Sequence, residues 1–285
     1  MWMWLLLAVA DWAAVEQLVA RGEYRAAQEQ LSRLPQDTAR WHVLASRIAD
    51  GNNDPASAAR AAEAALRLDP RSEAAHLQLG GIFLSRNTPE AALDIFTEAQ
   101  NVLPQSQLIR LGRGLAFKEL QRWEEAETTL RACLPHPLAY DALATILIQR
   151  GRFADARTLA DEFRMAAPKD HRGWYFLAAA LDGLNETGVE TAVRRALELE
   201  PRFAAAHALY GKWLLRQEQW QHAATELEQA ARLRPDLVQA HLHLAQAYQK
   251  LGRADDAARE FQTVRALKEQ EKIPRQRLLY HRGAQ

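Results

Sequence analysis

The chain lacks an excess of charge of either sign, because its 285 residues include 36 Lys and Arg against 36 Asp and Glu. Phosphate backbones and anionic lipid surfaces are usually met by clustered Lys and Arg, whose long-range field a balanced chain does not have. Nucleic acid is therefore not an expected partner.

Cysteine is nearly missing as well, since Cys133 is the only one. A single thiol can make neither an internal disulfide nor a thiolate metal cage. Packing alone must hold the fold, and a hydrophobic content of 48% is enough to bury a continuous core.

Long apolar runs are missing after the first ten residues. Segment 1–10 is apolar throughout and ends in Ala8-Val9-Ala10, which is similar to an export signal, although no Lys or Arg precedes it and such signals have about 15 to 30 residues. It is too short to span a bilayer, which needs roughly 20 apolar residues. We expect export to the periplasm in preference to a cytoplasmic location, and the alternative that this segment opens the first helix stays open. No membrane span is expected.

Motifs of catalysis and cofactor binding are also missing. The sequence contains no Gly-x-x-x-x-Gly-Lys-Ser/Thr loop for phosphate, no Gly-x-Ser-x-Gly elbow and no His-Glu-x-x-His pair for zinc. His241 and His243 would lie about 200° apart around a helix, so they cannot grip one ion. We therefore predict no catalytic residue, no cofactor, no metal site and no enzyme activity.

What the sequence does contain is a repeat of about 34 residues. Prolines follow Ala- and Leu-rich runs, and 70 to 104 and 201 to 235 are both steps of 34. A proline there ends a helix, because it has no N–H and disfavours helical geometry in the residue before it. The set is Pro70, Pro104, Pro168, Pro201 and Pro235.

A small residue marks the second helix of most repeats, at a point where two helices must approach closely. Large residues three positions before it and four positions after it follow the period of one helical face, and strand alternation is absent. These small residues are Ala27, Ala58, Ala92, Ala126, Ala156, Ala223 and Ala257.

The first helix of each repeat has a small position of its own. Gly80, Gly211 and Ala245 each stand between large residues, so that the neighbouring helix can sit close. Gly151 and Gly252 follow such helices and are predicted to adopt the left-handed conformation that ends a helix.

Histidine and cysteine fit the same repeat. His76, His207 and His241 share the aromatic position near the start of the first helix, and we interpret them as flat packing residues. Cys133 falls where other repeats have alanine, so we interpret it as a small buried residue.

The pattern resembles the tetratricopeptide repeat (TPR) family, whose 34-residue unit reads W-x2-L-G-x2-Y, then A-x3-F, then P. The resemblance covers nearly the whole chain and implies an all-α fold, a right-handed α-solenoid of about eight helical hairpins that shield each other's apolar faces. The predicted units are 8–37, 38–72, 73–106, 107–136, 137–170, 171–203, 204–237 and 238–271.

Three segments are less regular than the rest. The first helix of unit 107–136 fits two registers, around Leu108–Gly112 or around Gly114–Phe117. Segment Asp182–Gly188 is interpreted as a loosened turn, and residues 272–285 as a C-terminal cap or a solvated tail.

The resemblance also implies where a partner would bind, because first-helix positions two, five, nine, twelve and thirteen line the concave surface of such arrays. Lys212, Arg216 and Lys250 would then form a cationic patch for an acidic side chain or chain terminus, with Tyr175 as an apolar anchor. The alternative is an ordinary solvated face. The Lys and Asn clamp by which some members hold terminal carboxylates is not recognisable. The candidate groove residues are Leu77, Leu138, Asp141, Tyr175, Lys212, Arg216, Gln246 and Lys250.

These observations favour a non-catalytic interaction scaffold that binds a partner peptide or helix in its groove. The alternative is an accessory or regulatory domain of an enzyme or of a cell-envelope assembly complex. Reversing the charge of Lys212 and Arg216 is predicted to weaken partner capture while leaving helicity unchanged.

Overall fold

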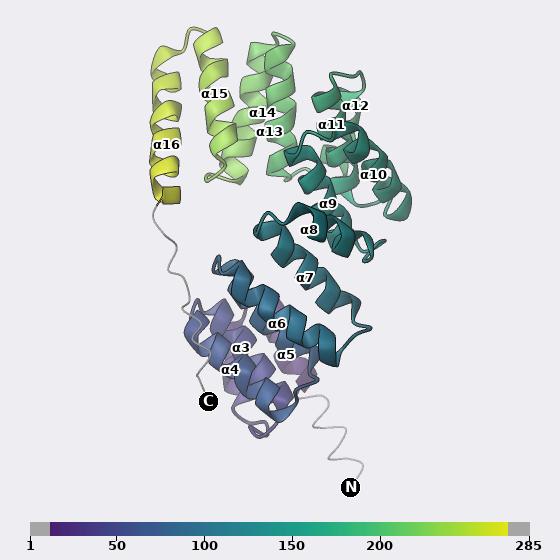
Figure 1. Ribbon diagram of the computed structural model, residues 1–285. Helices are drawn as coiled ribbons and strands as arrows, with labels where there is room; N and C mark the ends of the chain where they lie inside the picture. The colour runs from purple at the N-terminus through teal and green to yellow at the C-terminus, as the bar shows by residue number, and fades with distance from the viewer. Residues whose placement is uncertain (1–11, 273–285) are drawn as a thin grey trace. The chain divides into compact units, whose positions relative to one another are not determined.

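The computed structural model describes residues 12–272, which are helices joined by short turns, with no strand among them (Figure 1). The predicted export signal at 1–10 and residues 273–285 of the predicted tail lie outside the described residues. The described chain divides into two compact units, residues 12–133 (unit 1) and residues 134–272 (unit 2).

Unit 1 consists of four helical hairpins. Its first helix covers residues 12–20 of the described chain. The others are α2 Tyr24–Leu31, α3 Ala39–Gly51, α4 Pro55–Leu68, α5 Glu73–Ser85, α6 Pro89–Val102, α7 Gln107–Glu119 and α8 Trp123–Arg131.

Unit 2 also consists of four hairpins within the described residues. Its helices are α9 Pro137–Gln149, α10 Phe153–Ala166, α11 His171–Leu184, α12 Val189–Leu199, α13 Ala204–Arg216, α14 Trp220–Leu233, α15 Val238–Lys250 and α16 Ala254–Lys272. No helix in the described part of the chain is both long and apolar enough to cross a membrane.

The predicted helix ends are confirmed. α4, α6, α10, α12 and α14 each end two residues before a proline of the predicted set. Gly151 and Gly252 have φ of 71° and 73°, as predicted for the ends of first helices. Each hairpin of the described chain has at least one such left-handed residue in its turn. In the others it is Gly22, Asn53, Asn87, Gln121, Asn185 or Glu218, and the turn between α11 and α12 has Gly188 as a second.

The small positions of the first helices receive large side chains from the second helices. A Cβ added at Gly80 would lie 2.3 Å from the Phe96 ring, and one added at Gly211 would lie 2.4 Å from Leu227. Both partners stand sixteen residues later in the sequence. A Cβ added at Gly114 would likewise lie close to Leu130, which is also sixteen residues later. Of the two registers open for predicted repeat 107–136, this contact selects the one around Gly114–Phe117.

The interpretation of Asp182–Gly188 as a loosened turn is wrong for its first part. Asp182, Gly183 and Leu184 belong to α11, and the left-handed residue that ends the helix is Asn185. The helix continues because Gly183 packs closely against the Phe153 ring and because Asp182 is held by charged side chains of α13.

First helices form a continuous layer in each unit. α3, α5 and α7 contact one another in turn in unit 1, and so do α9, α11, α13 and α15 in unit 2. Within the described residues, the second helices of successive hairpins do not contact each other in this way. The first helices are therefore closer together, and a surface lined by them is the one that curves inward in each unit.

Candidate peptide-binding hollow

The predicted groove residues fall into both units. Leu77 lies on α5 of unit 1, where it is half-buried and packs against the unit's hydrophobic core. The other seven lie on first helices of unit 2. The site is therefore described on unit 2 alone.

A hollow of ≈ 700 Å³ opens on the first-helix layer of unit 2. It brings together three of the predicted residues, Asp141, Tyr175 and Lys212. Leu138, Arg216, Gln246 and Lys250 do not line it, and Leu138 is 46% exposed. The complete lining is Asp141, Thr145, Tyr175, Phe176, Ala205, Ala208, Leu209, Lys212, Arg234, Leu237, Gln239 and His243.

Tyr175 forms the aromatic part of the floor. Its ring centroid lies 5.2 Å from that of Phe176 and 5.0 Å from that of Phe203, the latter edge to face. Burial raises the pKa of Tyr175, and the negative charge of Asp141 raises it further. The hydroxyl therefore stays protonated at neutral pH, and the ring is held in place as an apolar surface.

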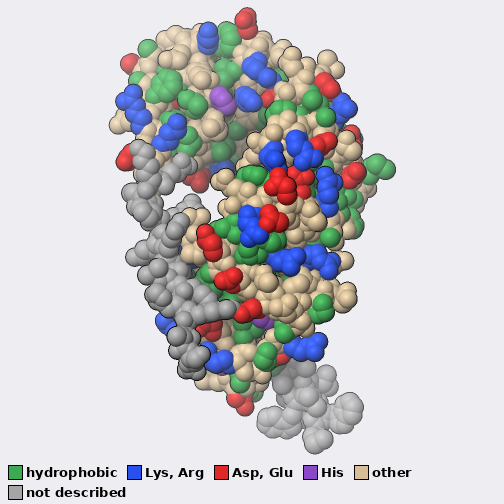
Figure 2. Space-filling view, viewed as in Figure 1, with side chains coloured by type: hydrophobic (Ala, Val, Ile, Leu, Met, Phe, Trp, Pro, Cys, Tyr) green, Lys and Arg blue, Asp and Glu red, His purple; other side chains and the backbone are tan. Residues whose placement is uncertain are grey.

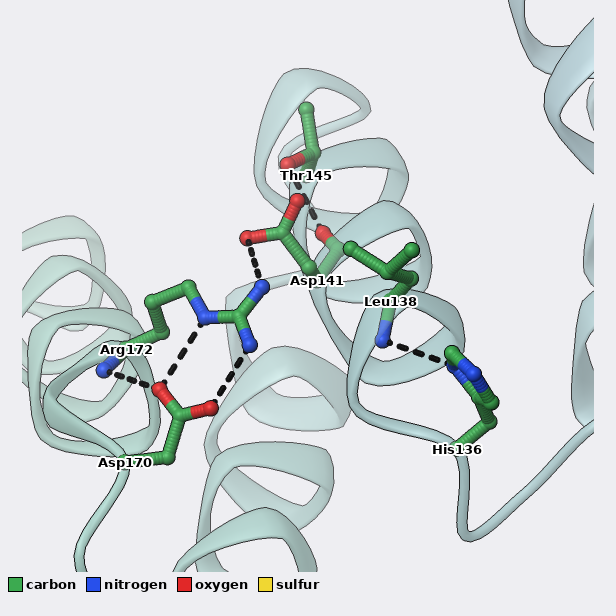
Figure 3. Close-up of polar contacts among 6 residues, drawn as sticks. All are labelled: His136, Leu138, Asp141, Thr145, Asp170 and Arg172. Carbon is green, nitrogen blue, oxygen red and sulfur yellow. Dashed lines mark hydrogen bonds and ion pairs between the residues drawn. The ribbon is translucent and has the colours of Figure 1, made fainter. Parts of the chain in front are cut away.

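Asp141 stands at one end of the hollow as part of a chain of ion pairs (Figure 3). Its Oδ1 lies 3.8 Å from a guanidinium nitrogen of Arg172, whereas Arg172 donates shorter hydrogen bonds of 2.6 Å and 3.0 Å to Asp170. The bonds to Asp170 raise the pKa of Arg172. Burial opposes ionisation of Asp170, but the bonds from Arg172 outweigh it and lower the pKa of that carboxyl.

Local hydrogen bonds fix the two helices that carry these side chains. Asp170 caps α11 by accepting a bond of 3.0 Å from the backbone N–H of Arg172. His136 caps α9 through Nδ1, which accepts from the backbone N–H of Leu138 at 3.2 Å (Figure 3). Such caps satisfy donors that the first turn of a helix leaves open.

Lys212 and Arg216, predicted as part of a cationic patch, share a partner within the chain. Lys212 Nζ donates to Asp182 Oδ2 at 3.0 Å, and Arg216 binds the other carboxylate oxygen. The Asp182 side chain is 4% exposed and the two cations are each 44% exposed. Lys250 lies over the Trp220 ring instead, 5.5 Å from its centroid. Figure 2 accordingly shows Lys and Arg interspersed with Asp and Glu on the face that it draws.

Several residues of the hollow were missed by reasoning from the sequence. Ala205, Ala208 and Thr145 occupy first-helix positions two, five and nine, the positions that identified Leu138, Asp141 and Lys212, so the pattern could have found them. Arg234 and Leu237 come from the turn before α15, and His243 lies on α15 outside the five positions. No signal in the sequence places these three in the hollow.

The remaining chemistry-bearing residues are built into the packing. The Cys133 side chain is buried and its Sγ donates to the Thr129 carbonyl at 3.3 Å. Burial raises the pKa of this thiol, although Arg110 and Arg113 oppose the shift. Among the described residues, no group of three or more His, Cys, Asp and Glu is arranged to hold a metal ion.

The hairpins bury an alanine or glycine of one helix under a large side chain of the other, and they stack through their first helices. This arrangement defines an all-α solenoid. Family models described as tetratricopeptide repeat match residues 43–106 and 137–180, and one described as TPR repeat matches residues 211–252. The chain belongs to the tetratricopeptide repeat family, and the resemblance seen in the sequence is confirmed.

The chain is also similar to individual known proteins. Protein FlbA of Caulobacter vibrioides is 31% identical over 150 residues, which are 51% of this chain and 25% of that protein, so the chain matches only a quarter of this curated relative. A tetratricopeptide repeat protein of Parabacteroides merdae superposes with a TM-score of 0.67 at 15% identity, over 84% of this chain and 98% of that one.

Two further solved structures show the same fold. The APC/C hetero-tetramer Cut9–Hcn1 matches with a TM-score of 0.67 at 17% identity, over 82% of this chain and 48% of that chain. PilW, described as a type IV pilus biogenesis factor, matches with a TM-score of 0.61 at 15% identity, over 72% of this chain and 98% of that chain.

Proposed function

We propose that this protein is a non-catalytic interaction scaffold that receives a peptide or helical segment of a partner protein in the hollow of unit 2. One observation supports this most strongly: the first-helix layer opens into a hollow of ≈ 700 Å³ with an aromatic and aliphatic floor and charged groups at its rim. Binding pockets typically have volumes of about 300–1,000 Å³ and combine an apolar lining with a few polar groups. The volume fits a few side chains of a segment.

Filling the hollow tests this proposal. Ala208 lies on α13 in the hollow, and Trp in its place would occupy the space meant for the partner. The matched control is Ala154→Trp, which adds the same side chain at an exposed position on α10. We expect Ala208→Trp to abolish capture of partner proteins from a lysate, measured by quantitative mass spectrometry, whereas Ala154→Trp retains it.

The opposite result would overturn the proposal. Equal capture by both variants, with circular dichroism showing both to be folded, would mean that the hollow is not the binding surface. The other groove residues, Leu77, Leu138, Arg216, Gln246 and Lys250, stay predictions, and single alanine variants in the same capture experiment test them.

The role as an accessory or regulatory domain of an enzyme or of a cell-envelope assembly complex stays a prediction too. The likeness to PilW is one of fold alone. The identity of a partner that Ala208→Trp loses decides between the two, since an enzyme or an envelope component would support the accessory role.

A further inference from the structure

Small side chains form the middle of the hollow. Among the four first helices of unit 2, α13 alone has alanine at both of the positions two and five, Ala205 and Ala208. The two stand three residues apart, so they lie on one face of α13, and both are partly exposed in the hollow. The flanking helices α11 and α15, which both contact α13, have larger side chains at these positions. Ala205 and Ala208 therefore form a low apolar surface, the alanine surface, between two helices with longer side chains.

Fixed apolar side chains border the alanine surface. Tyr175 packs edge to face on Phe203 with 5.0 Å between the ring centroids, and both rings pack against the hydrophobic core of unit 2. Leu209, next to Ala208 in the sequence, lines the hollow and packs against the same core. Because this core holds the side chains from behind, they lose little freedom when a ligand packs on them. The hollow thus offers a preformed apolar surface with an aromatic ring at its border.

The charged side chains of the lining are paired within the chain. The pairs are Lys212 with Asp182 at 3.0 Å, Asp141 with Arg172 at 3.8 Å and Arg234 with Asp236 at 3.9 Å. Asp182 is 4% exposed, so a ligand carboxylate that drew Lys212 away would leave a buried charge with one cation fewer. Arg234 and Asp236 are both more than half exposed, and an ion pair in water contributes little.

His243, the remaining basic side chain of the lining, is neutral at pH 7. Burial and then the charge of Lys212 lower its pKa. The lining therefore favours an apolar ligand group over a charged one, since its charges already have partners and its apolar floor does not.

We propose that the hollow of unit 2 holds one aromatic side chain, Trp, Tyr or Phe, of the partner segment. Its ring lies on the alanine surface, with Tyr175 and Leu209 against its edge. A ring suits this place better than a branched aliphatic side chain, because it covers a flat surface and gains an edge-to-face contact with another ring. In many interfaces a few buried aromatic side chains carry most of the affinity. This inference rests on the proposed function of the hollow and gives the chemistry of the side chain that anchors the partner there.

Selection from random peptides tests the inference. A library of 12-residue peptides, displayed within a loop of a carrier protein, is panned against the immobilised full chain, its Ala208→Trp variant and its Ala154→Trp control. We expect the peptides retained by the unaltered chain and by Ala154→Trp, but not by Ala208→Trp, to share one aromatic position. Peptides that share an acidic or an aliphatic residue and no aromatic one would overturn the inference.

Changes in a selected peptide measure what its aromatic residue contributes. Affinity for the full chain is followed by fluorescence anisotropy of the labelled peptide. We expect replacing the aromatic residue by Ala to weaken binding about thirtyfold, and replacing it by Leu to weaken it about tenfold. Raising NaCl from about 0.1 M to about 0.5 M should change the affinity less than about twofold, because salt screens ion pairs and leaves apolar contacts in place. A loss of about tenfold in high salt, or an unchanged affinity of the Leu peptide, would overturn the inference.

A double-mutant cycle tests whether the ring lies on the alanine surface. Ala208→Leu fills part of the hollow, and Ala154→Leu is the matched control at an exposed position of α10. With Ala208→Leu, exchanging the peptide's aromatic residue for Ala should cost less than about threefold, whereas Ala154→Leu should show the full loss seen with the unaltered chain. Equal losses with both variants, with circular dichroism showing both to be folded, would place the ring elsewhere and overturn the inference.

The outcomes separate the two proposals. Peptides that Ala208→Trp no longer retains, but that bind the unaltered chain without an aromatic residue, would overturn the inference and leave the proposed function standing. A library that yields no peptide retained better by the unaltered chain than by Ala208→Trp would overturn both.

Discussion

His76 in unit 1 and His207 and His241 in unit 2 occupy the same position of the repeat and make one contact in common. Each ring places Nε2 2.9–3.0 Å from the carbonyl oxygen of a proline six residues earlier in the chain. Because a carbonyl oxygen only accepts, Nε2 donates in all three. The interpretation of these histidines as packing residues thus leaves out a hydrogen bond that ties the first helix to the turn before it.

The two units differ in what the second ring nitrogen, Nδ1, contacts. Nδ1 of His207 lies 2.7 Å from Glu226, and Nδ1 of His241 lies 2.6 Å from Glu260, each nineteen residues later. The same spacing from His76 leads to Ile95, which is buried, and Nδ1 of His76 has no hydrogen-bond partner among residues 12–272. A carboxylate favours a second ring proton. The comparison teaches that the repeat determines where the ring packs, whereas one residue of the second helix determines whether Nδ1 meets a carboxylate.

The largest losses of stability are expected from substitutions at the small first-helix positions, which the two units have in common. Gly80→Ala and Gly211→Ala should each destabilise the protein by about 1–3 kcal/mol, because the new methyl group would overlap Phe96 or Leu227. The control is Gly81→Ala, where a Cβ meets nothing within 4 Å and alanine is the better helix former by about 1 kcal/mol. Urea unfolding measures all three. A loss of stability in Gly81→Ala equal to that in Gly80→Ala would contradict the packing described for both units.

The next effect concerns His207 in unit 2. Burial opposes protonation of His207, but the bonds to Glu226 and to the Pro201 carbonyl outweigh it and raise the pKa of His207. A raised pKa means that the folded state holds the proton more tightly than the unfolded one, so this stabilisation is complete below about pH 6.5 and is lost as pH rises through the folded value.

Glu226→Gln checks that sign. We expect the pKa of His207, followed by the NMR shift of its ring proton, to fall, and stability to drop at pH 6 by about 1–2 kcal/mol and less at pH 9. A pH-independent loss in Glu226→Gln would show that the carboxylate acts by packing and not by charge.

The smallest effects concern the turns inside the hairpins. Gln121 in unit 1 and Glu218 in unit 2 have φ of 57° and 59°, a region that glycine enters more readily than other residues. Replacing either by glycine should raise the free energy of unfolding by about 0.5–1 kcal/mol, and Gly252→Ala should lower it by a similar amount. Thermal unfolding would refute this account if both glycine variants were less stable than the unaltered chain.

The fold could be predicted from the sequence because its determinants are local and repeat. Proline at a helix end, and alanine or glycine under a large side chain sixteen residues away, are visible in a single hairpin. The register around Gly114 needed the structure, because Gly112 offers a second small residue that packs on Phe96 of the preceding hairpin. The division at residues 133 and 134 lies three residues from the predicted boundary between repeats 107–136 and 137–170, but the repeat pattern does not distinguish that boundary from the others.

The site was only partly predictable, because charges pair between hairpins. Family positions found Asp141, Tyr175 and Lys212, but Asp182 stands 30 residues before Lys212 and binds it across two first helices. This pairing changes the expected result of charge reversal. Glu at positions 212 and 216 would surround a buried carboxylate with two more, so loss of stability is expected together with loss of capture.

Photocrosslinking tests the central claim most directly, that partners bind at the first-helix surface of unit 2. A photoreactive residue replaces Leu209 in the hollow or, as the control, the exposed His222 on α14. We expect irradiation in a native lysate to join a partner to position 209 and not to position 222, and Ala208→Trp to remove that product. Crosslinks formed only from position 222, or a product at 209 that survives Ala208→Trp, would contradict the account.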